Sequence, residues 1–135
     1  MKKVICFGTF DLFHLGHLNY FKQAKKYGDY LIVVIARDKT KRKMKKKIFF
    51  SEKERLALVK NLKIVDKAIL GDMQNFLKPI INEKPAVVCL GYDHKLKVKE
   101  LQTKLSELGL FPVIKRAKAY FSNKYKSTHL RRIMG

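Results

Sequence analysis

Acidic residues and long apolar runs are what this sequence most clearly lacks. It carries only 11 Asp and Glu against 31 Lys and Arg, a formal net charge of +20. No apolar run approaches the roughly 18 residues of a transmembrane helix, which excludes a membrane span. The apolar run after Met1-Lys2-Lys3 is broken by Gly8 and Asp11 too early for a secretory signal, so we expect a cytoplasmic protein.

Cysteine is scarce, and no internal repeat or linker interrupts the chain. Cys6 and Cys89 both sit inside apolar runs, which favours buried, reduced thiols over a disulfide or a metal site. A chain of 135 residues can bury a core without disulfides or a structural metal. We therefore expect residues 1–135 to form a single domain.

The positive charge predicts anionic partners but does not choose among nucleic acid, an acidic membrane surface and a nucleotide. Lysines occur along the whole chain, most densely from Lys39 to Lys47. Most of them fit an ordinary solvated surface. A catalytically inactive nucleic-acid-binding protein remains an alternative, although the sequence has none of the aromatic-rich basic strips that strand recognition uses.

Strand-like apolar runs alternate with amphipathic helical stretches, which predicts an α/β fold with a doubly wound, five-stranded parallel sheet. Ser51 and Glu54 form a capping box at one helix start, and glycines at 28 and 109 are expected to end two other helices. The expected strands are 4–7, 30–36, 67–70, 86–90 and 111–114; the expected helices begin near 18, 51, 75, 98 and 127.

The helical spacing also predicts which side chains point inward. In the helix expected at 75–82, these are Phe76, Ile80 and Ile81. The helix expected at 98–108 carries Val98, Leu101, Leu105 and Leu108 on one face. Ligands of such folds bind beyond the carboxyl ends of the strands, so the loops 8–17, 37–50 and 91–95 should meet at one crevice.

Residues 8–17 hold the most specific motif, Gly-Thr-Phe-Asp-Leu-Phe-His-Leu-Gly-His, between the first strand and the first helix. A helix start offers free N–H groups and the positive end of a dipole, which together bind phosphate. The imidazoles of His14 and His17 add donors that stabilise developing negative charge. The motif therefore predicts a polyphosphate site.

This decapeptide resembles the signature of the cytidylyltransferase-like nucleotidyltransferases, whose Rossmann-like fold carries an HxGH motif. The resemblance implies that His14 and His17 stabilise the triphosphate while the α-phosphorus is attacked. It also implies that Thr9 and Phe10 supply backbone donors, that Asp11 fixes the loop and that Gly16 allows the nucleotide to approach. The family normally uses Mg²⁺ and forms dimers.

Other family positions are matched less completely. Arg55 matches a family arginine that reaches the phosphates, but the usual lysine position falls on Met44, and we favour Lys46 as its replacement. Gly91, Tyr92 and Asp93 resemble the segment that lines the base and ribose pocket. The family's C-terminal element is reduced to Ser127 and Thr128 after Lys126, with Arg116 as a doubtful substitute for its arginine.

The acceptor is the least determined part of this interpretation. Ala36-Arg37-Asp38 together with Leu90-Gly91-Tyr92-Asp93 most resembles the archaeal FAD synthetases, which transfer AMP from ATP to FMN. The alternative is a CTP-dependent cytidylyltransferase acting on glycerol 3-phosphate or a similar small phosphate, because that group shares the opening decapeptide. A homodimer that binds ATP or CTP and a phosphate-bearing acceptor is expected in either case.

Overall fold

The computed structural model describes residues 1–43 and 47–120. Within them, strands and helices alternate along the chain, with two helices between the second and third strands. The strands are β1 (Lys3–Gly8), β2 (Tyr30–Ile35), β3 (Lys67–Leu70), β4 (Val87–Leu90) and β5 (Val113–Arg116). The helices are α1 (Leu15–Lys25), α2 (Asp38–Lys43), α3 (Glu52–Lys60), α4 (Lys78–Glu83) and α5 (Val98–Glu107).

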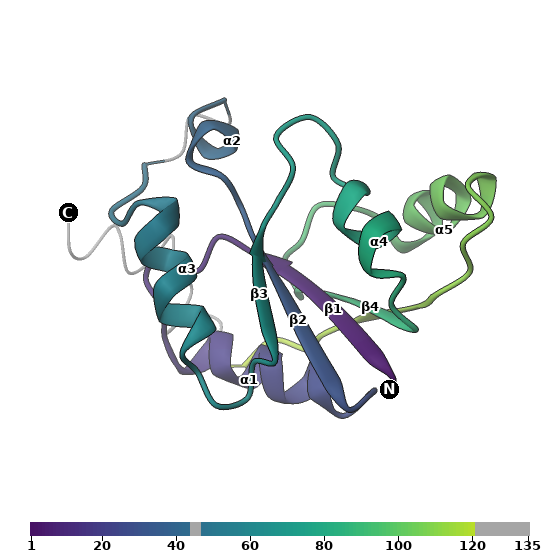
Figure 1. Ribbon diagram of the computed structural model, residues 1–135, viewed down its shortest axis with the longest axis horizontal. Coiled ribbons are helices and arrows are strands. Elements are labelled where there is room, and N and C mark those ends of the chain that lie inside the picture. The colour runs from purple at the N-terminus through teal and green to yellow at the C-terminus, as the bar shows by residue number, and fades with distance from the viewer. Residues whose placement is uncertain (44–46, 121–135) are drawn as a thin grey trace.

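All strand pairs are parallel, and the order across the sheet is β3-β2-β1-β4-β5. The chain moves outward from β1 through β2 to β3, then crosses back to β4. In Figure 1, α1 and α3 lie on one side of the sheet and α4 and α5 on the other. The predicted doubly wound parallel sheet is therefore confirmed, and strand order reverses between β1 and β4.

Two hydrophobic cores, one on each face, hold the sheet. Alternate side chains of β1 face opposite sides, so Val4 and Cys6 join the core beneath α1 and α3, while Ile5 and Phe7 join the core beneath α4 and α5. Strand β2, which lies between β3 and β1, is apolar throughout because both of its faces are covered.

Both thiols are free and buried, as predicted. Burial raises the pKa of Cys6 well above its usual value and raises that of Cys89 to about 11. Both side chains therefore stay protonated and pack as small apolar groups.

The predicted capping box is present at the start of α3. The Ser51 side chain accepts from the Glu54 N–H, and the Glu54 carboxylate accepts from the Ser51 N–H. Gly109 follows α5 with a φ of 76°, the left-handed conformation expected after a helix end. The prediction for Gly28 was wrong: α1 already ends at Lys25, with Lys26 as its cap. A Cβ at Gly28 would lie 2.5 Å from the Lys2 carbonyl oxygen, so the glycine serves close backbone approach.

Three further expectations on helices were wrong. The basic stretch after β2 begins with the short helix α2, which its uniformly polar composition did not indicate. Phe76 precedes α4 instead of pointing inward from it, and its side chain is 38% exposed. Leu108 lies at the C-cap of α5, one residue beyond the helix, and is also exposed.

No helix within residues 1–43 and 47–120 has the length and apolar character needed to cross a membrane. The final helix expected from 127 to 133 lies outside the described residues.

Candidate active site

His14 and His17 build the N-terminus of α1 as a reciprocal cap. The Nδ1 of His14 accepts from the Gly16 N–H at 3.1 Å, and the Nδ1 of His17 accepts from the His14 N–H at 3.2 Å. A ring nitrogen that accepts carries no proton, so each neutral imidazole is protonated at Nε2. The cap therefore fixes both tautomers and places each ring proton on Nε2.

The two imidazoles are also held against each other and against aromatic neighbours. Their ring centroids are 3.9 Å apart in a stacked arrangement, and His17 meets the Phe10 ring edge-on at 5.3 Å. Burial lowers the pKa of His14, which favours the neutral ring. Phe10 adopts a φ of 55°, and a Cβ on Gly8 would lie 2.5 Å from the Phe10 ring, so glycine is required at position 8.

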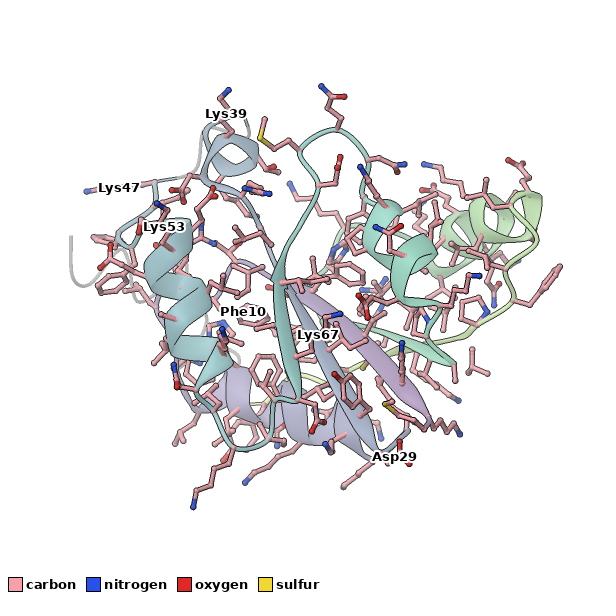
Figure 2. The ribbon with its side chains drawn as sticks, viewed as in Figure 1. Phe10, Asp29, Lys39, Lys47, Lys53 and Lys67 are labelled. Atoms are coloured by element: carbon pink, nitrogen blue, oxygen red, sulfur yellow. The ribbon has the colours of Figure 1, made fainter. Side chains whose placement is uncertain are left out.

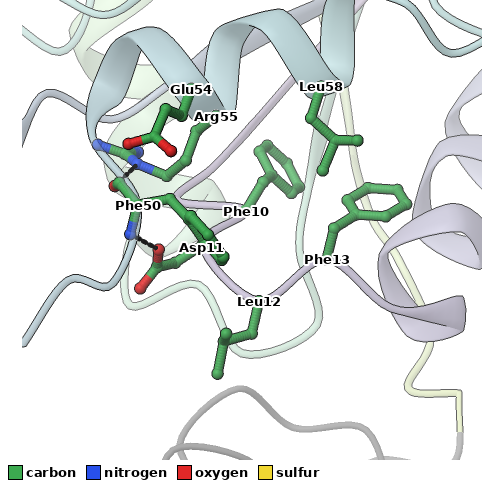
Figure 3. A pocket seen from close by; sticks show the side chains of 8 residues that line it. All are labelled: Phe10, Asp11, Leu12, Phe13, Phe50, Glu54, Arg55 and Leu58. Atoms are coloured by element: carbon green, nitrogen blue, oxygen red, sulfur yellow. Dashed lines mark hydrogen bonds between the residues drawn. The ribbon is translucent and has the colours of Figure 1, made fainter.

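The buried carboxylate of Asp11 ties this loop to the segment before α3. It accepts from the N–H groups of Phe49 and Phe50 at 2.7 and 2.8 Å, and the residue is only 2% exposed. Figure 3 shows Asp11 and Arg55 on either side of Phe50. This geometry agrees with the loop-fixing role expected of Asp11.

Arg55 supports the loop after β1 from inside the protein, and its side chain is only 1% exposed. Its guanidinium donates to the carbonyls of Phe50, Thr9 and Ala36 and to the Asp38 carboxylate, at 2.6 to 3.0 Å. These bonds join the ends of β1 and β2 to the start of α3. The structure therefore places Arg55 differently from the expected phosphate contact: its donors are directed at the protein.

Tyr20 of α1 separates the strands where the chain order reverses. The β1–β4 register ends at the pair Cys6 and Cys89. At the next residue of β1, the Tyr20 hydroxyl accepts from the Phe7 N–H, and it donates to the Cys89 carbonyl of β4. A side chain thus replaces a ladder bond between the strands, and this allows β1 and β4 to diverge into a crevice.

The crevice is a cavity of about 430 Å³ at the carboxyl ends of the strands. As the topology predicts, the loops after β1, β2 and β4 all line it. The predicted site residues found in its lining are Thr9, Phe10, His14, Gly16, His17, Gly91, Tyr92 and Asp93.

A second cavity, of about 500 Å³, opens on the outer side of the loop 10–13. Its lining is largely apolar and includes Phe13 and Leu58 (Figure 3). Two of its charged residues, Asp11 and Arg55, already form hydrogen bonds within the protein. The candidate active site is therefore the cavity that holds the two histidines.

Basic side chains surround the histidine cavity. Arg37, Lys41 and Lys47 line it from the segment after β2, and Lys95 and Lys118 line it from the segments after β4 and β5. Figure 2 shows Lys39, Lys47 and Lys53 at the end of the molecule where α2 and α3 begin. Lys46 lies outside the described residues, so its predicted phosphate contact stays a prediction.

Arg116, the candidate replacement for the family's C-terminal arginine, forms hydrogen bonds to the loop after β4. Its guanidinium donates to the carbonyls of Gly91, His94 and Leu96 at 2.6 to 3.0 Å. Arg116 thereby holds the loop after β4 that carries Tyr92 and Asp93. The Ser127-Thr128 element lies outside the described residues.

Sequence reasoning missed the part of the cavity formed after β3. Asp72, Phe76 and Pro79 line the cavity there. The available signal was position: Gly71-Asp72 follows a strand of the same parallel sheet, so its loop had to reach the same edge.

Comparison with known proteins agrees with this geometry. A family profile described as cytidylyltransferase-like matches residues 5–133. A protein named FAD synthase from Thermoplasma volcanium is 44% identical over 98% of this chain and 93% of its own length. One of the same name from Thermoplasma acidophilum is 42% identical over the same shares.

A solved structure gives the same result for the fold. The crystal structure of a protein described as a lipopolysaccharide core biosynthesis protein, from Thermoplasma volcanium GSS1, superposes with a TM-score of 0.87. It is 47% identical and covers 89% of this chain and 98% of its own. With its parallel sheet, its paired histidines at the head of α1 and these matches, the chain belongs to the cytidylyltransferase-like family of nucleotidyltransferases.

Proposed function

We propose that this protein is an FMN adenylyltransferase, which transfers AMP from ATP to FMN and releases pyrophosphate. The observation that carries the proposal is the match to proteins named FAD synthase, at 44% and 42% identity over 98% of the chain. The site supports it, because the cavity combines paired imidazoles with several cations. Residues 1–135 would then act as one nucleotidyltransferase domain.

The triphosphate is proposed to lie at the head of α1. There the positive end of the helix dipole favours an anion, and the cap holds the imidazoles of His14 and His17 in one tautomer, with the proton on Nε2. The backbone N–H groups of Thr9 and Phe10 are proposed to contribute from the loop, and Gly16 to admit the phosphates closely. Donors held in place before the reaction stabilise transition-state charge without reorganising.

The reaction needs no protein nucleophile. A phosphate oxygen of FMN attacks the α-phosphorus of ATP and forms the new P–O bond. The bond from the α-phosphorus to the bridging oxygen breaks, and pyrophosphate leaves with the electron pair. Charge increases on the oxygens around the α-phosphorus, where the imidazole donors and nearby lysines act.

The remaining site residues are proposed to position the two substrates. Gly91, Tyr92 and Asp93 would line the base and ribose pocket, with Asp93 accepting from a hydroxyl or amine. Ser127 and Thr128 would cap a last helix near the nucleotide. We propose that Lys46 of the basic segment contacts the phosphates. Its neighbours in the sequence, Lys41 and Lys47, line the histidine cavity and support this proposal.

The divalent cation is proposed to be Mg²⁺. Asp72 and Asp93 bring carboxylates to the cavity wall, and such oxygen ligands suit it. Within the described part of the chain, no three His, Cys, Asp or Glu side chains group as a metal site, which fits a cation held mainly through substrate phosphates. When bound, it would neutralise charge on the triphosphate. We also propose a homodimer, on family resemblance.

The test is a matrix of substrates given to the purified protein with Mg²⁺. ATP and CTP are each combined with FMN, glycerol 3-phosphate and a sugar phosphate, and products are separated by chromatography. We expect FAD from ATP with FMN and little product elsewhere. CDP-glycerol from CTP, with no FAD from ATP, would replace the proposal with a glycerol-3-phosphate cytidylyltransferase.

A further inference from the structure

A small aromatic group forms the wall of the cavity on the α4 side. The Phe76 ring lies 4.5 Å from the Phe7 ring and 5.5 Å from the His94 ring, measured between centroids. All three residues line the cavity that holds the catalytic histidines. They come from β1, from the loop before α4 and from the loop after β4, so the fold itself assembles the group.

The loop that carries Phe76 is held by its own polar groups. Oδ1 of Asp72 accepts from the N–H groups of Gln74 and Asn75 at 2.9 and 2.8 Å, and Oδ1 of Asn75 accepts from the Leu77 N–H at 3.0 Å. At the loop's start, Arg37 donates to the Gly71 carbonyl at 2.9 Å. The Phe76 ring is therefore presented from an ordered turn.

Phe76 is 38% exposed although the core next to it is already closed. Phe7 beneath it is 6% exposed and Ile80 is 1% exposed. Partial exposure of a phenylalanine is unfavourable in water, and an apolar surface inside a cavity is typical of a ligand wall. A small polar acceptor such as glycerol 3-phosphate has no apolar face to cover this ring, whereas a flavin has a flat, three-ring one.

His94 on the other side of Phe76 is kept as a neutral ring. Its Nδ1 accepts from the Leu96 N–H at 3.2 Å. Burial and the nearby Arg116 charge lower the pKa of His94. A neutral imidazole beside a phenyl ring extends the apolar wall instead of placing a charge in it.

From this arrangement we propose that Phe76, backed by Phe7 and flanked by His94, is the platform on which the isoalloxazine ring of FMN stacks. The inference rests on the proposed function, since it names the part of the site that selects the acceptor. Aromatic side chains stack on flat heteroaromatic rings in offset or tilted geometry. Phe76 is then a specificity-determining residue, separate from the groups that act on the triphosphate.

A purely structural role for Phe76, as an apolar cover over Phe7, makes a different prediction for leucine. Phe76→Leu keeps an apolar side chain on Phe7 but removes the flat ring. Phe76→Tyr keeps the ring. Phe111→Ala is the matched control, because Phe111 is 79% exposed and is not part of the cavity lining.

The experiment measures KM for FMN, KM for ATP and quenching of FMN fluorescence, with melting temperatures to confirm folding. We expect Phe76→Leu and Phe76→Ala to raise KM for FMN about tenfold, since both remove the aromatic face on which a flat ring stacks. KM for ATP should stay within about twofold, because the triphosphate contacts are untouched. Phe76→Tyr and Phe111→Ala should behave as the wild type does.

The outcomes separate this inference from the proposed function. If the wild type makes FAD and Phe76→Leu has an unchanged KM for FMN, the platform is wrong and the activity stands. If the wild type makes no FAD, the activity is wrong; the platform stands only if the wild type quenches FMN fluorescence and Phe76→Leu does not. A wild type that neither makes FAD nor quenches FMN overturns both.

Discussion

At the residue scale, His14 combines a structural task with the chemical task that we propose for it. Nδ1 caps α1 by accepting from the Gly16 N–H, and this fixes the proton on Nε2. The same bond that stabilises the helix therefore sets the tautomer of the imidazole that we propose acts on the triphosphate. The two tasks can be separated, because asparagine caps helices well but has no imidazole donor.

The first prediction uses this separation. His14→Asn should keep the melting temperature close to that of the wild type, whereas His14→Ala should lose about 1 kcal/mol of stability with the cap. Both variants should lose about 10²-fold in kcat if the imidazole stabilises transition-state charge. Thermal unfolding and steady-state FAD formation measure the two effects, and a His14→Asn enzyme with wild-type kcat would remove His14 from the chemistry.

A second prediction concerns the titration of His14. Burial lowers its pKa in the folded protein below the usual 6.5. The unfolded chain then binds the proton more readily, so the stability linked to this group is present above pH 6.5 and is lost as the pH falls below it. Because the pKa of His94 is lowered too, the titrations need residue-resolved NMR of the ring protons. A His14 titration at or above pH 6.5 would contradict the buried neutral ring.

At the scale of the elements, two side chains shape the crevice from below. Tyr20 takes the place of a β1–β4 ladder bond, and Arg55 joins the ends of β1 and β2 to the start of α3. The described hydrogen bonds of both side chains go to the protein itself. Both determine where the loops that carry Thr9 and His14 begin.

The third prediction tests the Tyr20 bridge. Tyr20→Phe leaves the Phe7 N–H and the Cys89 carbonyl without this partner in a buried setting. The loss should be about 1–3 kcal/mol in the free energy of unfolding, measured by urea titration. Tyr27→Phe is a suitable control, since the described hydrogen bonds include none from its hydroxyl. Equal stability of the two variants would show that the hydroxyl bridge is unimportant.

The fourth prediction decides between a brace and a phosphate ligand at position 55. Arg55→Lys replaces a planar fork by a single ammonium group, which cannot serve four separated acceptors. We expect about 1–3 kcal/mol of lost stability, the cost of leaving buried carbonyl acceptors without a donor. Unchanged thermal unfolding together with a raised KM for ATP would identify Arg55 as a phosphate contact instead.

These elements also show what local sequence can and cannot indicate. The strands were predictable because a strand covered on both faces must be apolar throughout, and the start of α3 because its cap is made by two residues three positions apart. The roles of Arg55 and Arg116 could not be predicted from local sequence, because their partners are carbonyls at the ends of other strands. Phe76 was expected inside a helix because its spacing fits one, whereas the Asx turn at Asp72 delays the helix by three residues.

At the scale of the whole molecule, the sheet order and the charge act together. Parallel strands bring the loops that follow them to one edge, and lysines and arginines from the segments after β2, β4 and β5 line the cavity there. The net charge of +20 is thus partly concentrated where an anionic nucleotide would bind. We propose the histidine end of that cavity for the triphosphate and the Phe76 end, with its apolar surface, for the acceptor.

The most direct test of this account follows the label of ATP during one turnover. With FMN, Mg²⁺ and ATP labelled at the α-phosphorus, we predict that the label appears in FAD, whereas label at the γ-phosphorus appears in pyrophosphate. Attack at the γ-phosphorus would instead leave the α-label in ADP. Labelled ADP, or the absence of labelled FAD under conditions where the protein is folded and binds ATP, would contradict adenylyl transfer to FMN.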